Sequence, residues 1–262
     1  DREVLGGVKT QAAEDEAQSR LLTMRVSDGN NSSEARVVVN ADATPDYDSS
    51  EDAPLLYDEN LKDLPMLYTV ADDQAVAVNT VPSIDWLPLG VISNGASSSS
   101  ANVLGRNKAD ASSTTKLSLK LKGLDKLSAP LYLYDAESKQ YRELTDDEAV
   151  EIAANEHGRY FLTTTRGATG IEAATTDENA VKVYSPVSGT LVVSSPAPIL
   201  NKVEVFTVDG KLVATRQLQE ANTVSIPVEA SAVYIVKVTV RLDSNQYSNE
   251  NDKVLTRKLS IR

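Results

Sequence analysis

Few side chains in this sequence can act as a nucleophile or carry a proton. His157 is the single histidine, and the chain has no cysteine. A site with two histidine ligands, a zinc knuckle and a thiolate nucleophile are therefore excluded. The surrounding run Asn155-Glu-His-Gly158 is typical of a turn, so we expect His157 to be a solvated turn residue rather than the base of a catalytic triad.

Carboxylates are the remaining reactive groups, and they are abundant. Two of them facing each other across a cleft could hydrolyse a glycosidic bond. Because acids are spread along the whole chain and no long aromatic-rich loop frames a pair, the requirements for a catalytic site are not met. We predict that the protein is not an enzyme, and we keep a carboxylate-dependent hydrolase as the competing hypothesis.

One acidic run could bind a cation. Asp46, Asp48, Glu51 and Asp52 offer hard oxygen ligands of the kind that calcium prefers. The run lacks the glycine and the terminal bidentate glutamate of an EF-hand loop. The alternative is a solvated acidic loop between strands, in which the carboxylates cap turns. Apart from this candidate calcium site, we expect no cofactor.

Trp86 is the one residue that suggests a sugar ligand. It is the only tryptophan, and ten of the thirteen aromatic residues are tyrosine. Exposed Trp or Tyr rings can stack on pyranose rings, so Trp86 is a candidate ligand residue. Its neighbours Ile84 and Leu87 favour the alternative, a residue packed in the core or at a sheet edge.

Charge and hydropathy exclude two classes of partner. The 26 Lys and Arg against 38 Asp and Glu give a net charge of −12, which repels nucleic acid and anionic lipid. No stretch approaches 18 apolar residues, so no transmembrane segment is predicted. The chain begins at Asp1 without Met or a basic-then-apolar leader, as expected of a processed or shortened chain.

The elements that must position these residues are short strands. Residues 115–121 alternate apolar Leu117, Leu119 and Leu121 with polar neighbours, the period of a strand with one wet face. Similar runs occur at residues 21–26, 35–41, 66–70, 74–78, 86–93, 131–134 and 159–165. No long segment of helical period separates them, so we predict an all-β protein with an antiparallel sandwich.

One segment could be helical. Thr145-Asp-Asp-Glu148 is a capping-box pattern, and Gly158 could end a helix after it. The alternative makes Val150 and Ile152 the inward residues of a strand. We favour the strand, for the reason given by the resemblance below.

The second half begins after a polar linker. Residues 166–180 hold one large apolar residue, Ile171. Seven candidate strands then follow in about 85 residues, the number in an immunoglobulin-like sandwich. Between two of them, Asp209-Gly210 predicts either a type I′ turn or a type I turn with a glycine bulge. We therefore expect a jelly-roll-like sandwich over 1–168, a linker over 169–180 and an immunoglobulin-like sandwich over 181–262.

The second half resembles the C-terminal sorting domain of type IX secretion, found in exported proteins of Gram-negative gut and oral bacteria. The similar stretches occur in the order of that family. They are Val181-Lys-Val-Tyr184, Gly189-Thr-Leu-Val-Val193, Val203-Glu-Val-Phe-Thr-Val-Asp-Gly-Lys-Leu-Val213, Val233-Tyr-Ile-Val-Lys237 and Lys253-Val-Leu-Thr-Arg-Lys-Leu-Ser-Ile261.

The first half resembles a β-sandwich module that often precedes such domains. The similar stretches are Asn40-Ala-Asp-Ala-Thr-Pro-Asp-Tyr-Asp48 with Asp52-Ala53, the paired strands Leu67-Tyr-Thr-Val70 and Ala75-Val-Ala-Val-Asn79, and the closing strand Gly158-Arg-Tyr-Phe-Leu162. In that module the stretch before the closing strand is extended, which favours a strand at Val150 and Ile152.

Together these observations predict a secreted or cell-surface bacterial protein without catalytic activity. Its role would be adhesive, binding or structural, with a protein or glycan outside the cell as partner and, through the second half, the export machinery. The alternative is a carbohydrate-binding accessory module of a surface polysaccharide system.

Overall fold

The regular structure of this protein is almost entirely β. The computed structural model describes residues 20–58, 60–61, 64–93, 116–166, 180–197, 199–241 and 252–261. Apart from the 3-10 turn at Leu124–Lys126 and Ala180, which is also in 3-10 conformation, every regular element in these ranges is a strand, which confirms the all-β class. In these ranges, no helix is long and apolar enough to cross a membrane. The expected linker 169–180 lies outside them except for Ala180.

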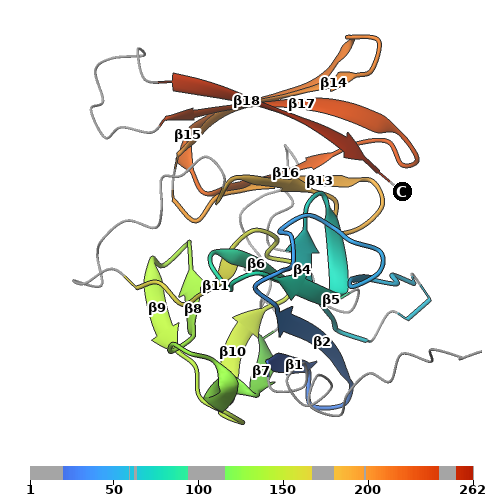
Figure 1. Ribbon diagram of the computed structural model, residues 1–262. Helices are drawn as coiled ribbons and strands as arrows, with labels where there is room; N and C mark the ends of the chain where they lie inside the picture. The colour runs from blue at the N-terminus through green and yellow to red at the C-terminus, as the bar shows by residue number, and fades with distance from the viewer. Residues whose placement is uncertain are drawn as a thin grey trace, which may run out of the picture.

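The first half, residues 20–166, contains eleven strands in one sheet (Figure 1). Their bounds are β1 Leu21–Ser27, β2 Ser32–Val39, β3 Ala53–Pro54, β4 Met66–Ala71, β5 Gln74–Val81, β6 Leu87–Ile92, β7 Lys116–Lys122, β8 Tyr132–Asp135, β9 Gln140–Glu143, β10 Val150–Ala153 and β11 Tyr160–Thr163. The order is β10-β7-β1-β2-β5-β4-β6-β11-β8-β9, with β3 paired to β5. All neighbours are antiparallel except β2 and β5, which are parallel.

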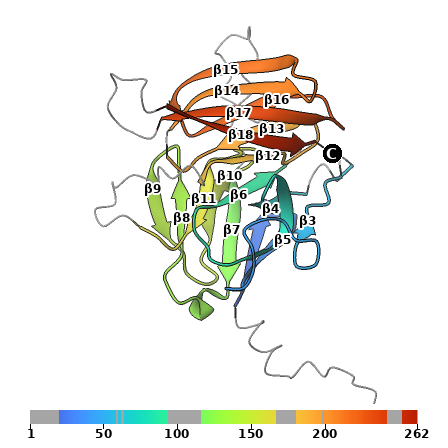
Figure 2. The same ribbon diagram turned by 45° about the horizontal axis from the view of Figure 1, so that its top comes forward.

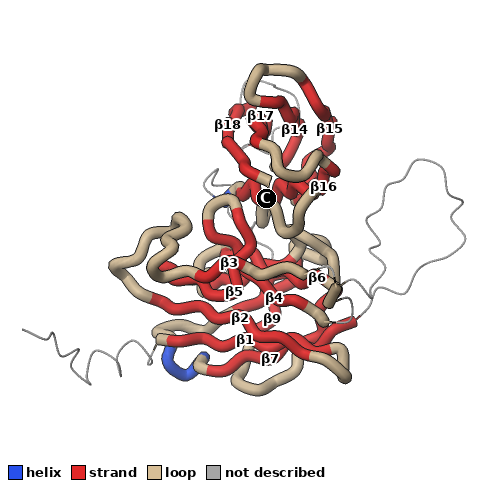
Figure 3. The backbone as a smooth tube through the Cα atoms, turned by 90° about the vertical axis from the view of Figure 1, so that its right-hand side faces the viewer, coloured by secondary structure: helices blue, strands red, loops and turns tan. Residues whose placement is uncertain are grey.

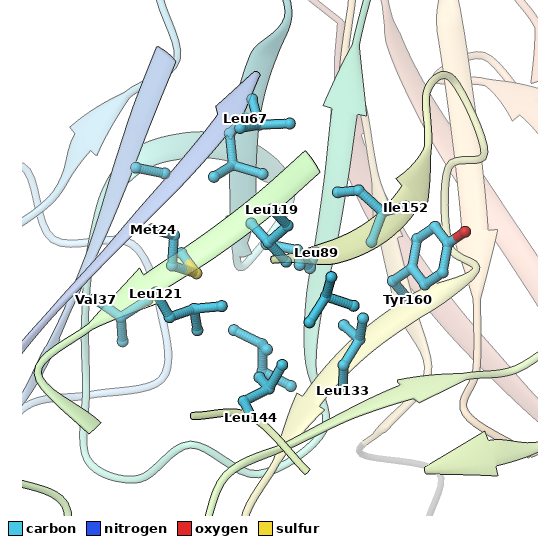
Figure 4. Close-up of a cluster of buried hydrophobic side chains, with 14 of the residues drawn as sticks. Met24, Val37, Leu67, Leu89, Leu119, Leu121, Leu133, Leu144, Ile152 and Tyr160 are labelled. Carbon is cyan, nitrogen blue, oxygen red and sulfur yellow. The ribbon is translucent and has the colours of Figure 1, made fainter. Parts of the chain in front are cut away.

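This sheet curls so that its two ends face each other across one apolar core. Figure 4 shows the core, where Met24 of β1 and Leu121 of β7 lie near Leu89 of β6 and Leu133 of β8. The alternation predicted for residues 115–121 is confirmed, because Leu117, Leu119 and Leu121 are buried and the lysines between and after them are exposed. Because successive side chains of a strand point to opposite faces, every second residue of β7 faces the apolar core enclosed by the curled sheet.

The segment with helical and strand alternatives is a strand. Val150 and Ile152 of β10 are buried and pair with Leu119 and Leu117 of β7. Thr145 and Glu148 do hydrogen-bond to each other, but over a single turn that leads into β10. Pairing with an existing strand provides backbone hydrogen bonds and burial of both apolar side chains, which outweighs the local capping signal.

The second half, residues 180–261, is a two-sheet sandwich of seven strands. The bounds are β12 Lys182–Tyr184, β13 Thr190–Ser194, β14 Leu200–Thr207, β15 Leu212–Ala221, β16 Thr223–Pro227, β17 Val233–Arg241 and β18 Asp252–Ser260. A three-stranded sheet, β12-β13-β16, faces a four-stranded sheet, β15-β14-β17-β18. At the hairpin between β14 and β15 the Gly210 amide donates to the Thr207 carbonyl, and Gly210 has φ +88°. Asp209 does not have positive φ, so the turn is the type I form with a glycine bulge.

The three-stranded sheet lies between the four-stranded sheet and the first half (Figures 1 to 3). Residues 191–194 of β13 are accordingly all buried, with Leu191 and Val193 in the sandwich core and Val192 against the first half. On the other side, β4 is buried along its full length. Leu67 of β4 faces the core of the first half, whereas Tyr68 faces the second half. Both halves therefore contribute strands that are covered on both faces.

Candidate functional site

The junction between the halves holds a cluster of buried aromatic and polar side chains that are distant in sequence. Tyr68 comes from β4, His157 from the turn between β10 and β11, and Tyr184 from β12. The Tyr68 hydroxyl lies 2.7 Å from Nδ1 of His157 in a hydrogen bond. The Tyr68 ring centroid lies 6.0 Å from that of His157 and 6.4 Å from that of Tyr184. Elements from both halves thus converge on Tyr68.

Two glycines make this convergence possible. Gly90 of β6 pairs with Tyr68 in the sheet, and the Tyr68 ring covers the space that a side chain at Gly90 would fill. Gly158 has φ +79° and lies against Ser194 and Thr223 of the second half. The Thr223 hydroxyl donates to the carbonyl oxygen of His157 at 3.1 Å. The turn at residues 155–158 is therefore fitted directly onto β13 and β16.

Burial keeps the cluster uncharged. It lowers the pKa of His157 to about 4. It raises the pKa of Tyr68 and of Tyr184 well above the usual value for a phenol. At neutral pH all three side chains are neutral, so they act as hydrogen-bonding and packing groups.

The expectation that His157 is a solvated turn residue is wrong. The turn is present, but the second half covers it, and the ring is bonded to a fully buried tyrosine. Sequence spacing could not show this, since Tyr68 and His157 are 89 residues apart.

The low pKa of His157 predicts a loss of stability in mild acid. An unfolded histidine titrates near 6.5, so between pH 6.5 and 4 the unfolded chain binds a proton that the folded chain excludes. Stability is therefore complete above pH 6.5 and falls as the pH falls through this window. The shift corresponds to roughly 3 kcal/mol, which we reduce to about 2 kcal/mol because the residue is partly exposed.

Denaturant unfolding at pH 7 and pH 4.5 checks this prediction. The variant His157→Asn lacks the titrating ring and should lose less stability over that interval than the wild type. Equal losses in the two proteins would show that His157 does not contribute to the pH dependence.

Charged groups also meet at the junction. The pKa of Asp72 is raised by burial and by the neighbouring Asp73 and Asp46, and the pKa of Lys182 is lowered by burial. Arg257 of β18 is close enough to act on both.

The described surface includes two grooves. The first, of about 350 Å³, runs along the junction, and the second, of about 310 Å³, opens beside the start of β1. The first is lined by Pro54, Leu55, Leu56, Tyr57, Asp73, Gln74, Ala75, Ser185, Pro186, Val187, Ser188 and Ser260. Asp73 is its only carboxylate, and the second groove has none. Neither groove therefore contains the two acids that glycoside hydrolysis requires.

Two of the four carboxylates predicted to bind calcium, Asp48 and Asp52, accept hydrogen bonds that hold their loop together. Asp52 is buried, and its two oxygens accept from the Thr80 and Asp48 amides at 2.7 and 2.8 Å. Asp48 accepts from the amide and hydroxyl of Ser50. Asp46 and Glu51 are exposed. No group of three His, Cys, Asp or Glu side chains suited to a metal occurs among the described residues, so this geometry supports the turn-capping alternative.

The interpretation of Trp86 as a sugar platform needs correction. Only 7% of Trp86 is exposed, and its ring packs edge-on against Tyr134 with centroids 5.4 Å apart. Trp86, Tyr134 and Phe161 belong to the same apolar cluster as the core of the second half. The core-packing alternative is therefore the better interpretation, because a ring in this position cannot stack on a ligand in solution.

The sequence analysis did not identify Tyr68, Tyr184 or Gly90 as residues of the junction. Tyr68 and Tyr184 lie in predicted strands, but their pattern does not show that both faces are covered. Gly90 carried a usable signal, since a glycine inside an apolar strand marks a close approach by another group.

Models of known protein families give no match to this sequence, and curated proteins include no significant relative. The resemblances to a sorting domain and to its preceding module thus remain predictions.

Proposed function

We propose that this chain is an exported, non-catalytic bacterial surface protein with an adhesive or structural role. In this proposal the first half presents the binding surface, and the second half is a sorting-domain-like sandwich that supports it. The observation that carries the proposal is the junction, where strands of both halves are buried on both faces and share two apolar clusters.

Such a junction suits a protein that bears load or holds a surface at a fixed orientation. Burial of apolar side chains on both sides resists relative movement of the halves, unlike a flexible tether. The hydrogen bond from the Thr223 hydroxyl to the His157 carbonyl and the fit of Gly158 add directional contacts to that burial.

Export can be tested in a bacterium that has type IX secretion. The full open reading frame, with an internal epitope tag, is expressed in the parent strain and in a strain without the translocon. We expect the tag on the cell surface or in the medium of the parent only, detected by antibody on intact cells. Equal exposure in both strains would contradict the sorting role of the second half.

Adhesion is tested separately. Cells with and without the gene are applied to immobilised host matrix proteins and glycans, and bound cells are counted. We expect the gene to increase binding to at least one surface. Equal binding everywhere would leave a scaffold role and contradict adhesion.

A further inference from the structure

The four-stranded sheet of the second half has one face that no described residue covers. This outer face points away from the first half, at the end of the molecule formed by β14, β15, β17 and β18 (Figures 1 and 3). Strand register places its side chains in rows across the sheet. Leu212, Phe206, Ile235 and Lys258 form the row nearest the β14–β15 hairpin, and Glu204 and Lys237 belong to the next.

The outer face is apolar at the hairpin end. Leu212 is 51% exposed, and Val208 at the hairpin tip is 69% exposed. Phe206 and Ile235 are partly exposed beside them. Apolar side chains gathered on an open sheet face are a common feature of interaction surfaces.

The same sheet is cationic, although the whole chain carries −12. Its four strands contain seven Lys or Arg and three Asp or Glu. Strand register places four of the cations, Lys202, Lys237, Arg241 and Lys258, on the outer face. Arg216, Arg257 and Lys253 pair with buried valines and have the opposite orientation. On the outer face, Lys202 and Arg241 are paired with Glu204 and Asp252. Among the described residues no carboxylate pairs with Lys237 or Lys258, and the Lys237 ammonium lies 5.2 Å from the Phe206 ring. The face therefore combines unneutralised positive charge with apolar surface.

The first half carries a segment of complementary chemistry. Residues 40–58 contain six acidic residues and no Lys or Arg. Five of the six are exposed, namely Asp42, Asp46, Asp48, Glu51 and Asp58. Within this acidic segment, Leu56 is the most exposed large apolar side chain of the described residues, at 84%. Acidic and apolar groups thus occur together, as they must to match the outer face.

One copy cannot satisfy this complementarity by itself. The acidic segment lies at the level of the junction, where Pro54, Leu55, Leu56 and Tyr57 line one groove with Ser185–188. The outer face points away from that level. We propose that the outer face of the four-stranded sheet binds the acidic segment, residues 40–58, of a second copy of this chain.

The two surfaces differ from each other, so the contact joins copies head to tail. A contact of this kind leaves a free outer face at one end of the assembly and a free acidic segment at the other, and it adds further copies unless the rotation closes a ring. This inference goes beyond the proposed function, because it concerns assembly and not export or adhesion to other molecules.

Sedimentation velocity of the full chain over a range of protein and salt concentrations tests the proposal. At about 0.01 M salt, where charges act over roughly 30 Å, we expect species heavier than the 28.2 kDa monomer, growing with protein concentration. At about 1 M salt, where the range falls to roughly 3 Å, we expect mostly monomer. A monomer under all conditions would overturn the proposal.

Charge-reversal variants identify the surfaces. Lys237→Glu with Lys258→Glu should abolish association at low salt. A matched control, Lys120→Glu with Lys139→Glu, changes the net charge equally at exposed sites of the first half and should retain it. Equal loss in both double variants would show a net-charge effect and overturn the assignment.

Mixing provides the decisive measurement. Asp42→Lys with Asp46→Lys should also abolish self-association, because it alters the acidic segment. A mixture of this variant with the Lys237/Lys258 variant should associate again, since each protein contributes one intact surface. No association in the mixture would overturn the proposal. So would a wild type that stays monomeric but binds anionic vesicles through Lys237 and Lys258.

Discussion

Replacing Gly90 by alanine is expected to destabilise the protein by at least about 3 kcal/mol. A Cβ at this position would lie within 3.0 Å of the Tyr68 ring and hydroxyl, closer than real side chains approach. Tyr68 is fully buried between the halves and its hydroxyl is bonded to His157, so the ring has no free space to enter. Close-packed interiors relieve such overlap only by moving the surrounding elements.

Denaturant unfolding of Gly90→Ala, Tyr68→Ala and the double variant measures this contact. The φ angle of Gly90 is not in the left-handed region, so an alanine at this position is not strained by its backbone conformation. In the Tyr68→Ala background the Gly90→Ala change should therefore cost little, because the ring is gone. If it costs as much there as in the wild type, the contact with Tyr68 is not the cause.

Gly158→Ala is expected to cost about 3 kcal/mol and to weaken the junction itself. Part of the loss is backbone strain, since Gly158 has φ +79°, and strain of this kind costs roughly 1 kcal/mol or more. The rest is steric, because the new Cβ would lie 2.5 Å from Oγ1 of Thr223 and 2.6 Å from Cβ of Ser194. Both contacts belong to the second half.

Gly189→Ala is the matched control for this prediction. Gly189 has nearly the same φ, +78°, but its nearest contact is a carbonyl oxygen at 3.5 Å. It should show the strain without the clash, about 1 kcal/mol. Gly158→Ala should in addition separate unfolding into two steps, as the halves lose their coupling. Equal losses and one cooperative step in both variants would contradict the importance of the Gly158 contact.

These two glycines link the fold to the proposed role. Each has no side chain at a point of close approach. Gly90 leaves space for the Tyr68 ring, and Gly158 leaves space for Ser194 and Thr223 of the second half. Without them the second half could not lie against β4 and the turn at 155–158. A fixed junction in turn keeps the outer face of the four-stranded sheet and the acidic segment apart on one copy.

Alternation of apolar and polar residues predicted strands where one face is buried and the other is exposed. In β7, Leu117, Leu119 and Leu121 alternate with polar residues because only one face is buried, whereas the strand at Val150 and Ile152 was favoured because of the resemblance to the module of the first half. The hairpin at Gly210 was also predictable, since its turn is local and requires positive φ. Such features depend on residues close in sequence.

The junction could be decided only by the tertiary structure. The runs at β4 and β13 are apolar on both faces, and sequence does not show which face meets which partner. Asp52 was a candidate metal ligand from its residue type alone. The sequence does not show whether a carboxylate accepts hydrogen bonds from buried amides or faces solvent. The sequence likewise did not show that the turn at His157 is covered by the second half, and it left both a ligand role and core packing open for Trp86.

What the sequence by itself determined was the all-β class and the position of its strands, because side-chain period and turn chemistry act over a few residues. What the tertiary structure alone decided was how Tyr68, His157 and Tyr184 meet, and which faces stay uncovered. Those contacts join residues about a hundred positions apart, and their burial depends on how whole sheets pack.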